Sequence, residues 1–238
     1  MSPSCATNDN KKDFMRSLIA ATMLGLCALL PLSTAASAAD FKNGADYLTL
    51  PEAQNTDAAG KVEVTEFFAY YCPHCNAFEP ALHAWVKKNA ANIVFKRVHV
   101  SVNSPAVQVQ QRLFYTLDAL GAVEQYHQKV FDAMHVERNR LASEEAAFDW
   151  AQKAGLDRAK FVEAWNSFGV QAKLRRANAM MAAYRIDSWP TVAIDGRYIT
   201  SPSQAGEGDK SLQTEEQLQQ GALKVMDFLV QKAKSEKK

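Results

Sequence analysis

Two cysteines separated by two residues are the part of this sequence best suited to chemistry. Cys72 and Cys75 enclose Pro73 and His74, and an apolar, aromatic-rich run at 66–71 precedes them. We expect this run to form a buried strand that leads into a helix beginning at Cys72. A thiol at a helix N-terminus faces unpaired backbone N–H groups and the positive end of the helix dipole, and both favour its thiolate. Cys75 would lie one turn further in as a shielded thiol, and this asymmetry suits thiol–disulfide exchange.

The two residues between the cysteines suit the same geometry. Pro73 is tolerated in the first helical turn, because its missing N–H is one that a helix leaves unpaired anyway. His74 would stabilise the Cys72 thiolate and so lower the pKa of that thiol below its ordinary value of about 8.5. A stabilised thiolate stabilises the reduced protein, which makes the disulfide a strong oxidant. The alternative for His74 is a solvent-exposed histidine without a chemical role.

A structural disulfide and half of a zinc site are the two other uses of such a cysteine pair. In the chain-entropy model, a bridge that closes four residues contributes only about 2 kcal/mol, against about 3 kcal/mol for fifteen residues. A Cys-x-x-Cys zinc site needs two further ligands, and the sequence has no second pair at short spacing, although the fold could bring His83 and His99 near. We therefore favour a redox-active pair and expect no metal and no cofactor other than the disulfide.

Glu66 is an acid in an otherwise apolar strand, six residues before the first cysteine. An acid is out of place in a strand that is covered on both faces. If Glu66 is buried it needs a partner, and Lys96 or Arg97 on the next strand could supply one. It could then relay a proton to or from Cys75 during exchange. The alternative is a solvated acid at a sheet edge.

The pattern along the chain predicts the elements that position these residues. A strand, a helix and a second strand suggest a right-handed crossover between parallel strands, followed by a long run with helical periodicity. Asp195-Gly196 is a tight-hairpin signal, and Thr214 with Gln217 forms a capping box. We expect an extended lead-in at 41–59 and a mobile loop at 201–210. The predicted strands are 62–70, 93–100, 191–195 and 197–200, and the predicted helices are 73–89, five within 104–184, and one after 214.

Residues 1–38 are typical of a secretory signal. Lys11, Lys12 and Arg16 precede an apolar run at 18–32, and Ala-Ser-Ala at 36–38 offers a cleavage site. A transmembrane anchor is the rival interpretation, but about fifteen apolar residues are fewer than the roughly 20 that a spanning helix needs. A lipoprotein signal would use Cys27, which follows the bulky Leu26 rather than a small residue.

Cleavage of this segment would leave Cys72 and Cys75 as the two cysteines of residues 39–238. In exported proteins, cysteines usually form structural disulfides that are spread along the chain. Two cysteines within four residues indicate redox chemistry instead. With 47% hydrophobic residues, the composition is that of a globular domain with a sizeable core. The remaining chain has 24 basic and 24 acidic residues, which gives no indication of a nucleic-acid partner.

The run Glu-Phe-Phe-x-x-x-Cys-Pro-His-Cys, the helical insertion, x-Pro-Thr before a strand and the Asp-Gly hairpin together resemble the DsbA family of bacterial periplasmic thiol:disulfide oxidoreductases. The resemblance covers nearly all of residues 39–238. It implies an α/β protein with a thioredoxin fold and an inserted all-helical domain. The expected division is a signal peptide at 1–38, thioredoxin-fold parts at 39–103 and 185–238, and the inserted helical domain at 104–184.

By the same resemblance, Cys72 is the cysteine that attacks a substrate sulfur or is attacked by one, and Cys75 resolves the mixed disulfide that results. Glu66 is the buried acid of the family. Pro190 would follow a cis peptide bond next to the cysteines, with the substrate strand extended beside it. The implied substrates are unfolded exported polypeptides with free thiols, and the implied reoxidant is a DsbB-like, quinone-linked membrane protein. We expect a monomer located in the periplasm.

Two residues depart from the family pattern. Arg97 stands where relatives often carry a lysine paired with the acid, and a guanidinium cannot give up a proton. Trp189 stands where a smaller aliphatic residue is usual, and its side chain could fill part of the peptide groove. Three rival functions remain open, which are a disulfide isomerase, a thiol reductase and a polypeptide-binding holdase. An isomerase usually has an added dimerisation domain, whereas only about twenty residues precede the first predicted strand here.

Overall fold

The computed structural model describes residues 1, 40–58 and 60–237, so the predicted signal peptide lies outside the described residues except for its first methionine. The described residues from Asp40 onward form one compact unit. Its centre is a five-stranded sheet with the strand order β1-β5-β4-β2-β3. The strands are β1 (Leu48–Thr49), β2 (Val62–Phe68), β3 (Ile93–His99), β4 (Thr191–Ile194) and β5 (Tyr198–Thr200).

The strand β2 lies inside the sheet and is buried along its whole length. It pairs in parallel with β3 and antiparallel with β4, which confirms the expected parallel pair around a crossover. β5 pairs antiparallel with β4, so the predicted hairpin at Asp195-Gly196 is present. The register places Glu66 of β2 opposite Arg97 of β3 and Val192 of β4. The acid is therefore held in the middle of the sheet and not at its edge.

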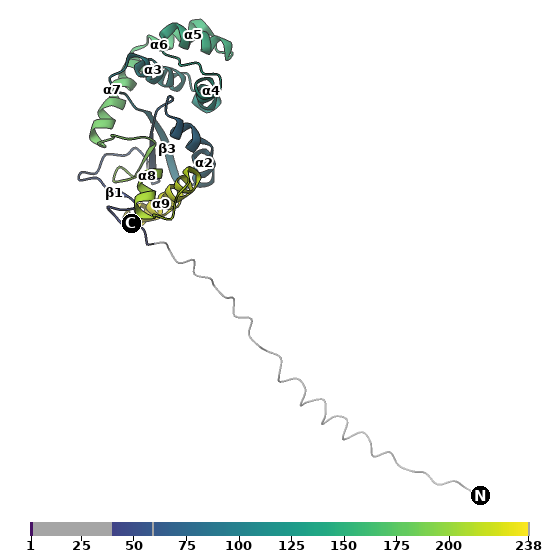
Figure 1. Cartoon of the computed structure of the whole chain (residues 1–238), viewed down its shortest axis with the longest axis vertical. Helices are drawn as coiled ribbons and strands as arrows, with labels where there is room; N and C mark the ends of the chain where they lie inside the picture. The colour runs from purple at the N-terminus through teal and green to yellow at the C-terminus, as the bar shows by residue number, and fades with distance from the viewer. Residues whose placement is uncertain (2–39, 59, 238) are drawn as a thin grey trace. The chain divides into compact units, whose positions relative to one another are not determined.

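Helices flank the sheet and also form a separate group at one end of the unit (Figure 1). Five of them, α3 to α7, lie between β3 and β4 in the sequence, which confirms the thioredoxin fold with a helical insertion. The helices are α2 (Pro73–Asn89), α3 (Pro105–Ala119), α4 (Val123–His135), α5 (Glu144–Lys153), α6 (Arg158–Trp165), α7 (Phe168–Ala183), α8 (Pro202–Gly208) and α9 (Glu215–Glu236).

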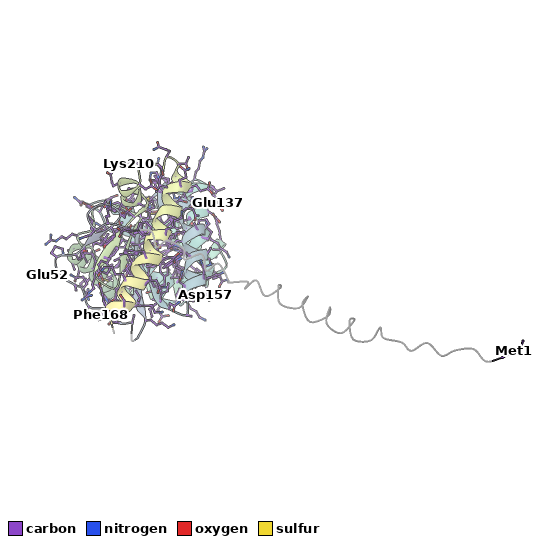
Figure 2. All side chains as sticks on the ribbon, turned by 90° about the horizontal axis from the view of Figure 1, so that it is seen from below. Met1, Glu52, Glu137, Asp157, Phe168 and Lys210 are labelled. Atoms are coloured by element: carbon purple, nitrogen blue, oxygen red, sulfur yellow. The ribbon has the colours of Figure 1, made fainter. Side chains whose placement is uncertain are left out.

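Two hydrophobic clusters hold these layers together. One cluster joins β2 to α2 and α9, with Val64, Leu82 and Leu229 among its buried members. The other joins the end of β2 and both cysteines to the insertion, with Phe68 and Phe131 among its members. Figure 2 shows α9 as the yellow ribbon that crosses the face seen from below. Because the cysteines belong to the second cluster, the insertion is part of their surroundings.

The expectation of a mobile loop over 201–210 is wrong, because most of this segment is the helix α8. Ser201 caps it, with its hydroxyl oxygen accepting a hydrogen bond from the Gln204 N–H at 3.0 Å, and Pro202 occupies the first helical position. These are ordinary helix-start signals. The lead-in at 41–59 contains the short strand β1, which the sequence did not predict and which pairs with β5.

The last helix begins with the predicted capping box of Thr214 and Gln217, and both of its hydrogen bonds are present. Within the described part of the chain, no helix combines the length and the apolar character needed to cross a bilayer. The domain boundaries that we place before and after the helical insertion, between residues 103 and 104 and between residues 184 and 185, remain predictions.

Candidate active site

Cys72 occupies the N-cap position of α2, where a strand ends and a helix begins. Its backbone is extended, with φ −80° and ψ 117°, and Pro73 follows at the first helical position. Its Sγ accepts a hydrogen bond from the Cys75 N–H at 3.3 Å. Both cysteines are free, so the structure is that of the reduced form. The helix start therefore presents a backbone donor to the sulfur, as the sequence predicts.

The two thiols have opposite pKa shifts. The hydrogen bond from the Cys75 thiol is the largest cause that lowers the pKa of Cys72 to about 6, with smaller contributions from the Cys75 and His74 N–H groups. Burial raises the pKa of Cys75 far above its ordinary range, and the neighbouring Cys72 raises it further. The pair therefore has one sulfur that is stable as a thiolate and one that is stable as a thiol. Cys72 is only 5% exposed, and its Sγ lies 3.7 Å from the Trp189 carbonyl oxygen.

His74 contacts α9 across the surface of the protein. Its Nδ1 lies 2.8 Å from Glu215 Oε1, a contact that sequence reasoning missed because the two residues are 141 positions apart. The hydrogen bond to Glu215 raises the pKa of His74. The imidazole is 69% exposed and its charge lowers the pKa of Cys72, but it is not the largest cause. Among the described residues, no three potential ligands lie together as a metal site.

Glu66 lies in the sheet below the cysteines and is 1% exposed. Arg97 is its partner, with Nε 3.4 Å from Oε2, whereas Lys96 binds Glu63 at 2.7 Å. Successive residues of a strand point to opposite faces, so Lys96 and Arg97 cannot both reach Glu66. Burial, strengthened by the nearby Glu79, raises the pKa of Glu66 to about 8, against the opposing charge of Arg97. Glu66 is therefore an uncharged acid at neutral pH.

Two further ionisable groups of this cluster were missed by sequence reasoning. Glu79 Oε1 lies 2.6 Å from the Arg97 guanidinium, and Glu79 Oε2 lies 3.4 Å from Nε2 of His127 on α4. The sequence did carry a signal for both residues. Glu79 lies one turn after Cys75 on the apolar stripe of α2, and His127 lies one turn from Val123 and Phe131 on the stripe of α4. A polar residue on a buried stripe needs a partner, just as Glu66 does.

Tyr70, two residues before the first cysteine, is held by three histidines. Its N–H donates to His99 Nε2 at 3.1 Å, and its carbonyl oxygen lies 2.7 Å from His135 Nε2. Its hydroxyl lies 3.0 Å from His127 Nδ1. His127 and His135 both belong to α4. The insertion therefore positions the segment that leads into the redox helix.

A pocket of 250 Å³ lies beside the cysteine helix. The peptide bond between Trp189 and Pro190 is cis, as the family resemblance implies. The Trp189 ring packs edge-on against Tyr71, with centroids 6.3 Å apart. The pocket is lined by the first turn of the redox helix, the cis-proline, α8 and the start of α9: His74, Ser188, Trp189, Pro190, Pro202, Ser203, Glu215, Leu218 and Gln219.

Comparison with known proteins gives one family. The model of the DSBA-like thioredoxin domain matches residues 63–218. The thiol:disulfide interchange protein DsbA of Bordetella parapertussis is 39% identical over 216 residues, which cover 91% of this chain and 98% of the relative. The protein of the same name from Pseudomonas aeruginosa strain PAO1 is 32% identical over 226 residues, which cover 93% and 98%.

Solved structures agree. The crystal structure of Pseudomonas aeruginosa DsbA superposes with a TM-score of 0.73 at 31% identity, and the match covers 82% of this chain and 96% of that one. The oxidoreductase NmDsbA1 of Neisseria meningitidis superposes with a TM-score of 0.67 at 27% identity, covering 84% and 97%. The range matched by the family model includes both cysteines, all five helices of the insertion and the cis-proline. The chain therefore belongs to the DsbA family of thiol:disulfide oxidoreductases.

Proposed function

We propose that this oxidoreductase acts as an oxidase in the bacterial periplasm and donates its Cys72–Cys75 disulfide to newly exported polypeptides with free thiols. The observation that carries this direction of transfer is the place of Cys72 at the N-cap of α2, where its Sγ accepts the Cys75 N–H at 3.3 Å. Hydrogen bonds at this position lower the pKa of Cys72 to about 6, while burial raises the pKa of Cys75. A sulfur that is stable as an anion is a good leaving group and stabilises the reduced protein. The disulfide form is then the high-energy form, and it transfers its bond readily.

Transfer takes two exchange steps. A substrate thiolate attacks Cys72 Sγ, which forms a mixed disulfide and releases Cys75 as a thiolate. The buried Glu66, whose pKa is raised to about 8, gives its proton to the Cys75 sulfur. A second substrate thiolate then attacks the substrate sulfur of the mixed disulfide and displaces the Cys72 thiolate. The substrate loses two electrons and gains a disulfide, and this protein gains the same two electrons as a dithiol.

The substrate chain lies extended beside Pro190, within reach of Cys72. Backbone hydrogen bonds to the cis-proline segment would hold it with little demand on its sequence. The pocket next to Pro190 accepts a small apolar side chain, while the large ring of Trp189 occupies part of the same wall. These features support a broad range of unfolded substrates.

Export by the predicted signal at 1–38 would place the protein where disulfides form. We propose that it works as a monomer and that a DsbB-like, quinone-linked membrane protein takes the two electrons back. The redox-active disulfide is then the redox group that this protein itself contributes to the cycle.

Refolding of a reduced, disulfide-dependent test protein with one equivalent of the oxidised protein tests this function. We expect each pair of thiols lost from the test protein to appear as a pair on this protein. Cys72→Ser and Cys75→Ser each lack the disulfide, so both variants should abolish transfer. Thiol loss that also occurs with Cys72→Ser would refute the assignment.

The same variants and test protein distinguish the three alternative functions. A holdase would keep the test protein soluble even after Cys72→Ser. An isomerase would restore activity to a fully oxidised, scrambled test protein without changing its number of thiols. A reduction potential near the value of about −270 mV known for thioredoxin would indicate a reductase, whereas an oxidase requires a clearly less negative value.

A further inference from the structure

Two helices start beside the redox centre. His74 lies in the first turn of α2, and Glu215 is the first residue of α9. Thr214 caps α9 through the box that it forms with Gln217, so the sequence itself fixes where this helix begins. His74 Nδ1 lies 2.8 Å from Glu215 Oε1, and this contact joins the two helix starts.

A second contact holds the same two helices together about three turns further along each of them. Trp85 Nε1 donates to Asp227 Oδ1 at 2.8 Å, and the buried faces of α2 and α9 belong to one hydrophobic cluster. Both contacts come at nearly the same distance from the helix starts, so α2 and α9 run in the same direction with their N-termini together. The place of Glu215 beside His74 therefore follows from the packing of the two helices.

The charges around His74 come from few groups. The pocket of 250 Å³ beside the cis-proline is lined by His74 and Glu215. The other residues that line it, which belong to the segment before β4, to α8 and to α9, are all uncharged. The remaining charge is the thiolate of Cys72, two residues before His74. An imidazolium at this position therefore has two anionic partners, one on each helix.

The contact with Glu215 acts on the protonation of His74. An ordinary histidine has a pKa of about 6.5, so about a quarter of such side chains are protonated at pH 7. The hydrogen bond to Glu215 is the largest cause that raises the pKa of His74, and the charge of Cys72 raises it as well. The bond also holds Nδ1 on the side of Glu215. A larger fraction of the protein therefore carries an imidazolium at pH 7, with its ring held in one orientation.

Glu215 can act on the Cys72 sulfur by two routes of opposite sign. The charge of His74 lowers the pKa of Cys72, so a carboxylate that keeps His74 charged favours the thiolate. A carboxylate that acts directly on a nearby thiolate repels it and raises the pKa of the thiol. The Cys72 Sγ makes its hydrogen-bond contacts with the Cys75 N–H and the Trp189 carbonyl oxygen, whereas Glu215 contacts the imidazole. The geometry therefore favours the route through His74.

We propose that Glu215 is a positioning residue of the redox centre, which keeps the His74 imidazole protonated and in place to stabilise the Cys72 thiolate. The disulfide is then a stronger oxidant than the cysteine motif at the start of α2 would make it alone. When a substrate thiolate displaces Cys72 from the mixed disulfide, the leaving sulfur meets an imidazolium that is already charged. This proposal rests on the proposed oxidase function and adds to its redox centre a residue from the last helix.

Equilibration of the full mature chain with glutathione measures the oxidising strength of the disulfide. Oxidised protein and two molecules of glutathione give reduced protein and one molecule of glutathione disulfide, so the equilibrium constant rises as the reduced protein is stabilised. We expect Glu215→Gln to lower this constant about two- to fivefold at pH 7, the size expected for the loss of one exposed charge contact. This change makes the reduction potential about 9 to 21 mV more negative. The loss should fade below about pH 5.5, where the imidazole is protonated in both proteins.

Glu216→Gln is the matched control. Glu216 is the next acid in the same turn of α9 and is also exposed, but it is Glu215 that contacts His74. We expect Glu216→Gln to leave the equilibrium constant unchanged. In a His74→Asn background, Glu215→Gln should no longer lower the constant, because the direct repulsion of the thiolate is then the one route left.

NMR titration of the His74 ring gives a second readout. The pKa of His74 should fall in Glu215→Gln and stay unchanged in Glu216→Gln. The proposal is overturned if the equilibrium constant of Glu215→Gln is unchanged, or if it rises, which would show direct repulsion. It is also overturned if Glu216→Gln lowers the constant equally, or if Glu215→Gln still lowers it in the His74→Asn background. Failure of the wild-type protein to oxidise the reduced test protein would instead refute the proposed function, whatever these variants do.

Discussion

The depressed pKa of Cys72 makes the stability of the reduced protein depend on pH in a defined way. In the unfolded chain the thiol has a pKa of about 8.5, whereas in the folded reduced protein it is about 6. Between these values the unfolded state binds more protons, so the stability of the reduced protein rises with pH through this window. The oxidised protein has no thiol at this position and serves as an internal reference.

The size of the effect follows from the two pKa values. The Cys72 thiolate contributes about 1 to 2 kcal/mol of folding free energy at pH 7 and about 3 kcal/mol above pH 9. The contribution is lost as the pH falls through 6 and is absent below about pH 5. The free energy by which the thiolate stabilises the reduced protein also raises the reduction potential of the disulfide, and about 1.4 kcal/mol corresponds to about 30 mV.

Urea unfolding of the reduced and oxidised forms, each measured at several pH values from 4.5 to 8.5, tests this dependence. Stability of the reduced form relative to the oxidised form should grow by about 1 to 2 kcal/mol between pH 5 and pH 7. The carboxylates, including Glu66, are present in both forms, so their contributions largely cancel. Cys75 is a thiol only in the reduced form, but because its pKa is raised it lowers the stability of that form only as the pH approaches about 8.5, above the window from pH 5 to pH 7. Absorbance of the thiolate near 240 nm gives the pKa of Cys72 directly in the same samples.

A constant difference between the two forms over this range would refute the reasoning, because it would mean that Cys72 ionises no more easily in the folded protein than in the unfolded chain. Cys72→Ser is the control. This variant has no thiol at position 72 and forms no disulfide, so its own stability should lack the rise of about 1 to 2 kcal/mol that the reduced wild type gains between pH 5 and pH 7. A rise of the same size in the variant would have to come from another group.

Three further changes test the structure around this thiol. Glu66→Gln should stabilise the protein by about 2 to 3 kcal/mol in urea unfolding at pH 7, because a buried acid with a raised pKa destabilises the fold above its unfolded pKa; the gain should vanish below about pH 4.5. Arg97→Met should cost about 3 to 5 kcal/mol, since it leaves the buried Glu79 carboxylate without its cation. Ser201→Ala should cost about 1 kcal/mol by removing the cap of α8.

Each of these changes has a conservative counterpart. Glu66→Asp keeps the acid and should not show the stabilisation, so an equal gain in both variants would contradict the argument from ionisation. Arg97→Lys keeps the positive charge, so its free energy of unfolding should fall much less than that of Arg97→Met. Ser201→Thr keeps a capping hydroxyl and should stay close to the wild type; a loss as large as that of Ser201→Ala would mean that the cap is not the cause.

The helix start at the cysteines was predictable because its signals are local. A cysteine that can accept from the helix N–H groups and a proline in the first turn define the junction within a few residues, and the structure has both. The five helices of the insertion were found from stop and start signals of the same kind. The helix α8 carries equally local signals, Ser201 and Pro202, and was missed because its polar, glycine-containing sequence resembles a loop.

The partner of Glu66 could not be chosen from the sequence, because the choice depends on the register of β2 against β3. Lys96 and Arg97 are neighbours in the chain, and a shift by one residue would exchange their faces. The contact between His74 and Glu215 depends in the same way on where α9 crosses α2. Such contacts come from tertiary packing, and a single sequence carries no direct signal for them.

The three hydrogen bonds to Tyr70 bear on whether the helical insertion is a removable module. Two of them come from α4, so a shortened chain that joins β3 directly to β4 would keep both cysteines and the cis-proline but lose the side-chain and carbonyl contacts of Tyr70. A minimal redox domain built from this sequence would therefore need new partners for that residue before it could hold its thiols in the native arrangement.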